Sequence, residues 1–258
     1  MTEASEGPAR PGEDGGAALA GAGPVADLRT SFRIRDEIDR RIDARTLKAG
    51  ERLLSERELA ESFGTTRITL REALGMLESE GRLYREDRRG WFVAPPRLVY
   101  DPTERGTFER AARAQGRTPS TLVVDHAVVP SPSRVAVLLG TKPGAPILRI
   151  RRLRSLDARA VLYVEHYLQP DAFPGLDRHD LTGSMTVIYE RDYGFTYGGM
   201  VFEITTVGLH AEAAEPLRMA AGSPGLLVTR THDDPAGRRV DCDFEYWRHD
   251  AILVRVAV

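Results

Sequence analysis

The sequence predicts an α+β protein in which an N-terminal winged helix-turn-helix precedes a larger domain with a mostly antiparallel sheet. Residues 32–93 show three helical patterns followed by a potential hairpin, whereas the chain beyond residue 117 consists of β-branched runs separated by turns. These strands do not alternate regularly with helices, which favours an α+β arrangement over a parallel α/β one. A length of 258 residues is sufficient for two such domains.

The first two helices are indicated by periodicity and by capping residues. Isoleucines recur every four residues among charged side chains in residues 32–44, which predicts an amphipathic helix. Ser55 is a typical N-cap, and Glu58 three residues later completes the capping-box pattern of a second helix that ends near Ser62. Gly64 then permits a tight turn before the third helix.

The third helix carries paired arginines beside an apolar stripe. The stripe repeats at i, i+3, i+4 and i+7 and consists of Leu70, Ala73, Leu74 and Leu77. Arg67 and Arg71 are four residues apart, on a face that the stripe leaves exposed. Arginines placed in this way can bind guanine O6 and N7 in the major groove, although a solvated helix face carries such residues as well. The helix-turn-helix context favours double-stranded DNA as the partner.

A small hairpin, the wing, is expected after the third helix. Residues 82–85 and 91–93 can pair as strands around a tip at residues 86–90. With this hairpin, residues 32–93 resemble the DNA-binding domain of the GntR family. The three sequence blocks of that family occur here in order and with suitable gaps. The departures are Ala49 and Leu54 in place of proline, Thr66 in place of serine, and Arg88 and Trp91 in place of a wing glycine and threonine.

The helical pattern and the resemblance together indicate which residues contact DNA. They are Ser55, Arg57, Thr66, Arg67, Ile68, Thr69, Arg71, Arg89 and Gly90. Because one winged helix reads only a few base pairs, we expect a homodimer on a palindromic operator. The resemblance implies short half-sites of the GT…AC kind.

Composition excludes several other classes of protein. The chain is 41% hydrophobic and 29% charged, which is ordinary for a globular protein, and no run approaches the ~20 apolar residues of a membrane span. A single cysteine, Cys242, excludes an internal disulfide, and the histidines lack metal-ligand spacing, so we expect no metal and no cofactor. Residues 1–27 have the composition of a disordered tail and not of a signal peptide, which predicts a cytoplasmic protein.

The remaining chain divides at a proline-rich linker. We expect a tail at 1–27, a winged helix at 28–95, a linker at 96–116 that includes a short helix at 107–115, and a sheet domain at 117–258. In the last domain strands are expected at 122–129, 147–154, 161–168, 202–209, 225–232 and 239–247, and helices at 132–139, 184–192 and 211–220. This order resembles the UTRA ligand-sensing domain of the HutC subfamily, a fold similar to chorismate lyase. The resemblance rests on residues 147–168, 173–176, 181–184, 213–217 and 246–250.

Several polar residues of this domain are candidates for effector binding. Arg152 and Arg154 share one face of a strand, where they form either an anion clamp or solvated pairs with neighbouring acids. The resemblance implies that arginines on this strand bind the effector together with a serine that opens the following helix, here Ser184. Glu165 and Glu245 fit either contacts to a ligand hydroxyl or amine, or exposed strand positions, and Tyr246 fits a ligand contact or the core.

Three functions are compatible with these features. The favoured one is a transcriptional regulator, expected to be a repressor that releases its operator when a small anionic metabolite binds. The second is a constitutive DNA-binding regulator whose C-terminal domain only dimerises. The third is a lyase-like enzyme, which is disfavoured because the sequence contains no P-loop, nucleophile elbow or metal cluster.

Overall fold

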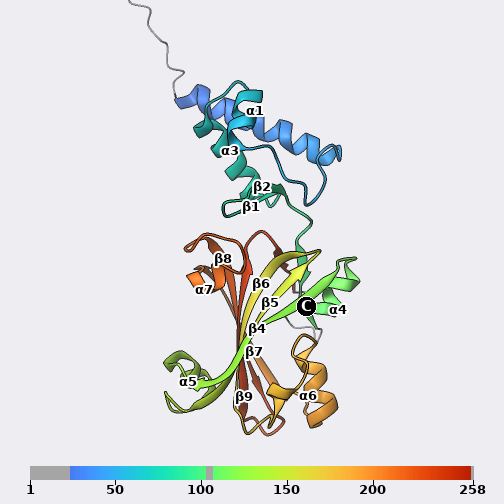
Figure 1. The fold of residues 1–258 in the computed structure, drawn as a ribbon, viewed down its shortest axis with the longest axis vertical. Coiled ribbons are helices and arrows are strands. Elements are labelled where there is room, and N and C mark those ends of the chain that lie inside the picture. The colour runs from blue at the N-terminus through green and yellow to red at the C-terminus, as the bar shows by residue number, and fades with distance from the viewer. Residues whose placement is uncertain (1–23, 103–106, 257–258) are drawn as a thin grey trace, which may run out of the picture.

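A computed structural model describes residues 24–102 and 107–256, which form a head above a six-stranded sheet (Figure 1). The head contains α1 (Pro24–Asp43), α2 (Glu56–Ser62), α3 (Arg67–Ser79), β1 (Leu83–Glu86) and β2 (Gly90–Val93). β1 and β2 pair antiparallel as the expected wing. None of the helices in the described ranges is long and apolar enough to cross a bilayer.

The capping pattern of the head is confirmed. The Ser55 side chain accepts from the Glu58 amide and the Glu58 carboxylate accepts from the Ser55 amide, so both halves of the capping box are present. The apolar stripe of α3 is fully buried against α1. One boundary was wrong: α1 starts at Pro24, so residues 24–27 belong to the head and not to the tail. Residues 1–23 of the expected tail lie outside the described residues.

The linker is part of the fold. Its strand β3 (Leu98–Tyr100) pairs in parallel with β10 (Ile252–Val254) near the C-terminus, a pairing that sequence reasoning missed. The following helix α4 (Phe108–Ala114) is capped by Thr107 and buries Phe108 in the core of the sheet domain. The expected helix at 107–115 is therefore confirmed, whereas the description of this segment as a linker was incomplete.

The sheet domain is built on six antiparallel strands, as predicted. They run in the order β4-β5-β6-β9-β8-β7 and comprise β4 (Pro119–Pro130), β5 (Pro146–Leu156), β6 (Arg159–Leu168), β7 (Gly199–Gly208), β8 (Pro224–Asp233) and β9 (Arg239–Arg248). The remaining helices are α5 (Ser133–Leu139), the 3-10 turn η1 (Leu176–Arg178), α6 (Met185–Tyr193) and α7 (Ala211–Ala214). α7 is shorter than the expected 211–220, because Pro216 cannot donate a helical hydrogen bond and Arg218 has a left-handed φ of 56°.

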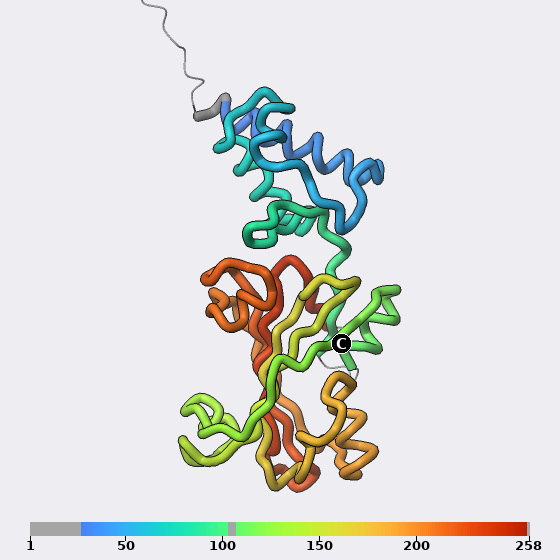
Figure 2. Tube along the Cα trace, in the orientation of Figure 1, coloured from blue at the N-terminus to red at the C-terminus, as the bar shows by residue number. Residues whose placement is uncertain are grey.

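The helices cover the two faces of the sheet differently. α5 and α7 lie on one side of it, and α4 and α6 lie on the other (Figures 1 and 2). Side chains of a strand alternate between these faces. On β9, Cys242, Phe244 and Tyr246 pack in the core with α5 and α7, whereas the intervening Asp241, Asp243, Glu245 and Trp247 face the side of α4 and α6. This alternation decides which polar residues reach the cavity described below.

Candidate nucleic-acid interface and ligand cavity

The recognition helix α3 presents a short exposed face at its N-terminus. Arg67, Ile68 and Arg71 are exposed, and Ile68 is 73% exposed although it is aliphatic. Thr66 caps the helix by accepting from the Thr69 amide at 3.2 Å. Thr69 itself is buried, with its hydroxyl 3.0 Å from that of Thr66, so the expected contact of Thr69 with DNA is not compatible with its position.

The wing and the helix-turn-helix enclose a basic groove. This groove has a volume of about 360 Å³, and the arginines that line it are Arg52, Arg57, Arg67, Arg85, Arg88 and Arg89. Arginines from four separate chain segments thus concentrate positive charge at one site, which suits a phosphate backbone. Sequence reasoning missed Arg52, Arg85 and Arg88. Arg52 reaches the groove because it bridges to Phe92 of β2, and Arg85 because β1 pairs with β2.

The wing tip keeps the backbone conformation of a glycine-rich turn. Arg88, at the family's glycine position, adopts a φ of 58°, and Gly90 has a φ of 93°. A left-handed conformation costs a non-glycine residue about 1–2 kcal/mol, so the departure affects stability more than wing geometry. Arg89 pairs with Glu86, and Arg57 pairs with Glu61 at 3.0 Å. Ser55 uses its hydroxyl within the capping box.

The wing also contacts the sheet domain through a cluster that we call the wing clasp, namely Arg159, Arg248 and Asp250 around Tyr84. The Arg159 guanidinium lies 3.5 Å from the centroid of the Tyr84 ring, and that of Arg248 lies 5.3 Å from it. Asp250 is fully buried and accepts from Arg159 at 2.7 Å and from Arg248 at 2.9 and 3.0 Å. Arg248 also donates to the Arg85 carbonyl of the wing at 3.0 Å. The clasp therefore fixes the head to the end of β9.

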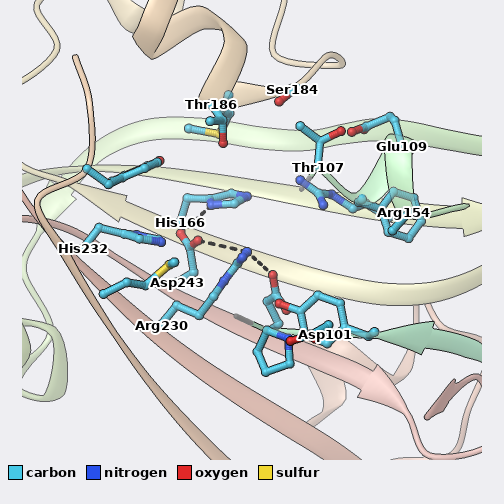
Figure 3. A pocket seen from close by; sticks show the side chains of 18 of the residues that line it. Asp101, Thr107, Glu109, Arg154, His166, Ser184, Thr186, Arg230, His232 and Asp243 are labelled. Atoms are coloured by element: carbon cyan, nitrogen blue, oxygen red, sulfur yellow. Dashed lines mark hydrogen bonds and ion pairs between the residues drawn. The ribbon is translucent and has the colours of Figure 1, made fainter. Parts of the chain in front are cut away.

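A cavity of about 460 Å³ lies on the face of the sheet beside α4 and α6. Figure 3 shows polar side chains from the linker, both helices and the sheet converging on it. Four of the candidate effector-binding residues line it, namely Arg152, Arg154, Ser184 and Glu245. Their roles differ, because some are already bonded within the protein.

Arg152 is committed to internal hydrogen bonds. It is 1% exposed, its Nε and Nη2 lie 3.1 and 2.9 Å from His166 Nε2, and its Nη1 donates to the Gly183 carbonyl at 2.9 Å. Burial lowers the pKa of His166 to about 4, so its imidazole is neutral, accepts from Arg152 and donates from Nδ1 to Asp243 at 2.5 Å. Arg152 thereby holds the segment that precedes α6 and is not available for the expected two-arginine clamp.

Arg154 is the arginine that remains available. It is 8% exposed, its guanidinium lies 5.1 Å from the centroid of the Phe108 ring, and its Nε is buried without a hydrogen-bond partner among the described residues. The hydroxyl of Tyr100 and Oε2 of Glu109 line the same cavity and also have no such partner. Buried polar atoms of this kind are costly unless a ligand or water satisfies them.

Ser184 and Glu245 complete the polar lining in different ways. Ser184 caps α6 by accepting from the Val187 amide at 3.4 Å, so a helix N-terminus opens beside the cavity. Glu245 is ion-paired with Arg230 and accepts from Trp247 Nε1 at 3.1 Å. Glu245 therefore contributes to the wall of the cavity mainly through an internal pair.

Glu165 and Tyr246 do not reach the cavity, contrary to expectation. Both lie on the opposite face of the sheet, where Arg134 bonds Glu165 at 2.9 Å and the Tyr246 hydroxyl at 3.0 Å. The cause is strand alternation, which directs His166 and Glu245 to the cavity and their neighbours away from it. Glu165 is buried, so its alternative of an exposed strand position is wrong as well, whereas Tyr246 lies in the core, which was its alternative.

Two models of known protein families match this chain. The model described as bacterial regulatory proteins, gntR family, matches residues 30–93, and the UTRA domain model matches residues 114–252. The chain belongs to the GntR family and carries a UTRA domain.

Relatives of this GntR-family protein are transcriptional regulators. The uncharacterized HTH-type transcriptional regulator YihL of Escherichia coli K12 is 33% identical over 84% of this chain and 93% of its own length. The HTH-type transcriptional repressor NagR of Bacillus subtilis is 28% identical over 78% of this chain and 82% of its own length. The crystal structure of PhnF from Mycobacterium smegmatis has a TM-score of 0.60 and 27% identity, and covers 87% of this chain and 98% of its own. The protein is thus a DNA-binding transcriptional regulator and not an enzyme.

Further residues of the UTRA cavity were missed from the sequence. They are Tyr100, Thr107, Glu109, His166 and Arg230. A partial signal was present, because acidic residues occupy every second position from Asp241 to Glu245 and so mark one polar face of β9. No sequence pattern indicated that residues of β3 and α4 line the cavity, because their position depends on how the linker folds back onto the sheet.

Proposed function

We propose that this regulator is a homodimeric repressor of the HutC type that releases a palindromic operator when a small anionic metabolite occupies the UTRA cavity. The observation that carries the proposal is Arg154, a buried guanidinium that has no carboxylate partner among the described residues and lines the cavity beside the N-terminus of α6. Phosphate, phosphonate or carboxylate groups suit such a combination. NagR and PhnF are both named as transcriptional repressors, which supports the repressor part of the proposal.

The route from the cavity to DNA runs through two connections in this proposal. The linker strand β3 places Tyr100 in the cavity wall and leads directly to the wing. Trp247 also lines the cavity, and the next residue, Arg248, belongs to the wing clasp. A ligand that prefers one placement of β3 or of the end of β9 therefore changes the position of the head and its fit to the operator.

Edge strand β4 supports dimerisation through the UTRA domain. Leu122, Val124 and Val128 on this strand are 61, 43 and 64% exposed. An apolar sheet edge is a favourable surface for association with a second copy. Sedimentation of the purified chain should give a dimer, and selection from random DNA should return an inverted repeat. A monomer or an asymmetric site would contradict this part of the proposal.

Operator contact is assigned to Arg67, Arg71, Ile68 and the wing residues Arg89 and Gly90. Replacement of Arg67 by Ala should weaken specific binding by about 1–3 kcal/mol if its guanine contact is bidentate. Fluorescence anisotropy with the selected operator measures this loss.

Thermal-shift screening against phosphosugars, phosphonates and amino-acid catabolites tests the sensing function. A ligand at 100 times its Kd should stabilise the protein by about 2.7 kcal/mol. The alternative, a constitutive regulator whose UTRA domain only dimerises, predicts no stabilisation by any anion and leaves the unpartnered cavity atoms unexplained.

A further inference from the structure

One carboxylate joins the recognition helix to the wing. Glu56, the first residue of α2, accepts from Arg71 Nε of α3 at 2.7 Å and from Trp91 Nε1 of β2 at 3.0 Å. Its side chain is 19% exposed, so this contact is more sheltered than an ordinary surface ion pair. Each carboxylate oxygen thus has a separate donor from a separate element.

The surroundings hold this carboxylate in place from two sides. The Ser55 capping box fixes the first turn of α2, and Trp91 is 6% exposed in the core of the head. Desolvation raises the pKa of Glu56, but hydrogen bonds from Trp91 and Arg71 outweigh it and keep the pKa below its usual value, so the group is ionised at neutral pH. Arg71, by contrast, is 61% exposed and would sample many rotamers without a partner.

The contact also determines which nitrogens of Arg71 remain free. Because Nε is used by Glu56, the two terminal nitrogens Nη1 and Nη2 are left to form an end-on pair of bonds with guanine O6 and N7. We propose that Glu56 is a positioning residue that, held by Trp91, presents Nη1 and Nη2 of Arg71 to one guanine of each half-site. This inference rests on the proposed operator contact by Arg71. It also gives Trp91, a departure from the family's threonine, a role in operator discrimination.

Arg57, in contrast to Arg71, has no sheltered carboxylate partner among the described residues. Its pair with Glu61 joins residues four apart on one helix, and both side chains are 63% exposed. Pairs of this kind are solvated and restrict the guanidinium little. We therefore assign base discrimination to Arg71 and not to Arg57.

The test uses the full chain and an operator selected by the parent protein. Affinities are measured for that operator, for each of its single base-pair variants and for a scrambled duplex. The proteins compared are the parent, Glu56→Gln, Trp91→Phe, Arg71→Ala and the double variant Glu56→Gln/Arg71→Ala. Glu72→Gln is the control, because it removes an exposed carboxylate from α3, next to Arg71 in sequence. Thermal unfolding confirms that each variant is folded.

Arg71→Ala should lose about 5- to 150-fold in discrimination at one base pair of each half-site. Glu56→Gln should lose several-fold in discrimination at that same base pair. It should bind scrambled DNA as tightly as the parent or more tightly, because the substitution removes a negative charge near the DNA phosphates. Trp91→Phe should show a smaller loss at the same position, and Glu72→Gln none. In the Arg71→Ala background Glu56→Gln should have no further effect on discrimination, since it acts through Arg71.

Four outcomes would overturn the inference. If Glu56→Gln weakens all sequences equally, Glu56 has only a structural role. If its loss of discrimination persists in the Arg71→Ala background, Glu56 reads DNA directly. If Arg71→Ala discriminates like the parent, the proposed operator contact by Arg71 itself fails. If Arg71→Ala loses discrimination but Glu56→Gln does not, the operator contact stands and only the positioning role of Glu56 is refuted.

Discussion

The buried carboxylate of the wing clasp provides the sharpest test of how the two domains are joined. Asp250 is fully buried and accepts three hydrogen bonds from Arg159 and Arg248. The substitution Asp250→Asn keeps the size of the side chain but leaves two buried guanidinium groups without a counter-ion. Removing one partner of a buried ion pair costs about 3–5 kcal/mol. We expect a loss of this size in the free energy of unfolding of the sheet domain.

The pKa of Asp250 gives a second measure of the same interaction. Desolvation raises this pKa, but the hydrogen bonds from Arg248 and the charges of Arg159 and Arg248 outweigh it and lower the pKa from 3.8 to about 2. At about 1.36 kcal/mol per pKa unit, this shift corresponds to roughly 2.5 kcal/mol. Because the folded-state pKa is depressed, the contribution is present above about pH 4 and is lost as the pH falls through about 2. The stability difference between parent and Asp250→Asn should therefore shrink over that interval.

Urea unfolding followed by tryptophan fluorescence measures both effects, since Trp91 reports on the head and Trp247 on the sheet domain. Asp36→Asn is the matched control. Asp36 pairs with Arg35 at the same distance of 2.7 Å, but its side chain is 65% exposed, so its loss should cost less than about 1 kcal/mol. The reasoning is refuted if Asp250→Asn costs no more than Asp36→Asn, or if its cost does not change between pH 5 and pH 2.

Two further predictions concern the head. Thr66→Ala removes the N-cap of α3 and should destabilise the head by about 0.5–2 kcal/mol in the same urea assay. Thr65→Ala is the control and should have little effect. Equal effects of the two substitutions would argue against the cap. Tyr84→Leu removes the ring beneath Arg159 and Arg248 and should weaken wing docking by about 0.5–2 kcal/mol, whereas Tyr84→Phe should preserve it. The Asp87 amide of the wing donates to the Arg218 carbonyl, and its hydrogen exchange should become faster only in Tyr84→Leu. Unchanged exchange in Tyr84→Leu would show that the wing clasp does not hold the wing.

The head could be predicted from the sequence because its signals are local. The Ser55 capping box, the Thr66 cap and the apolar stripe of α3 are all defined within a few residues, and each is present in the structure. The exception is Thr69, which is buried with its hydroxyl 3.0 Å from that of Thr66 and so does not reach the exposed face of α3. The Glu56 contacts with Arg71 and Trp91 lie beyond such reasoning, since they join residues 15 and 35 positions apart.

The cavity could be predicted only in part. The strand period of two correctly paired Arg152 with Arg154, but it could not show that Arg152 is bonded to His166 and the segment before α6. The same period should have separated Glu245 from Tyr246, since adjacent strand residues face opposite sides. The wing clasp and the pairing of β3 with β10 join residues more than 70 positions apart, so no local pattern could indicate them.

The central claim is that an anion in the UTRA cavity controls operator binding through Arg154. The most direct measurement is the operator affinity of the parent, Arg154→Met and Arg151→Met, each with and without the anion that gives the largest thermal shift in the parent. Arg151 is the control because it precedes Arg152 on β5 and pairs with Asp125 outside the cavity. We predict that all three proteins bind the operator, that the anion weakens binding by the parent and Arg151→Met at least about tenfold, and that Arg154→Met does not respond. An equal response of Arg154→Met and the parent would contradict the account.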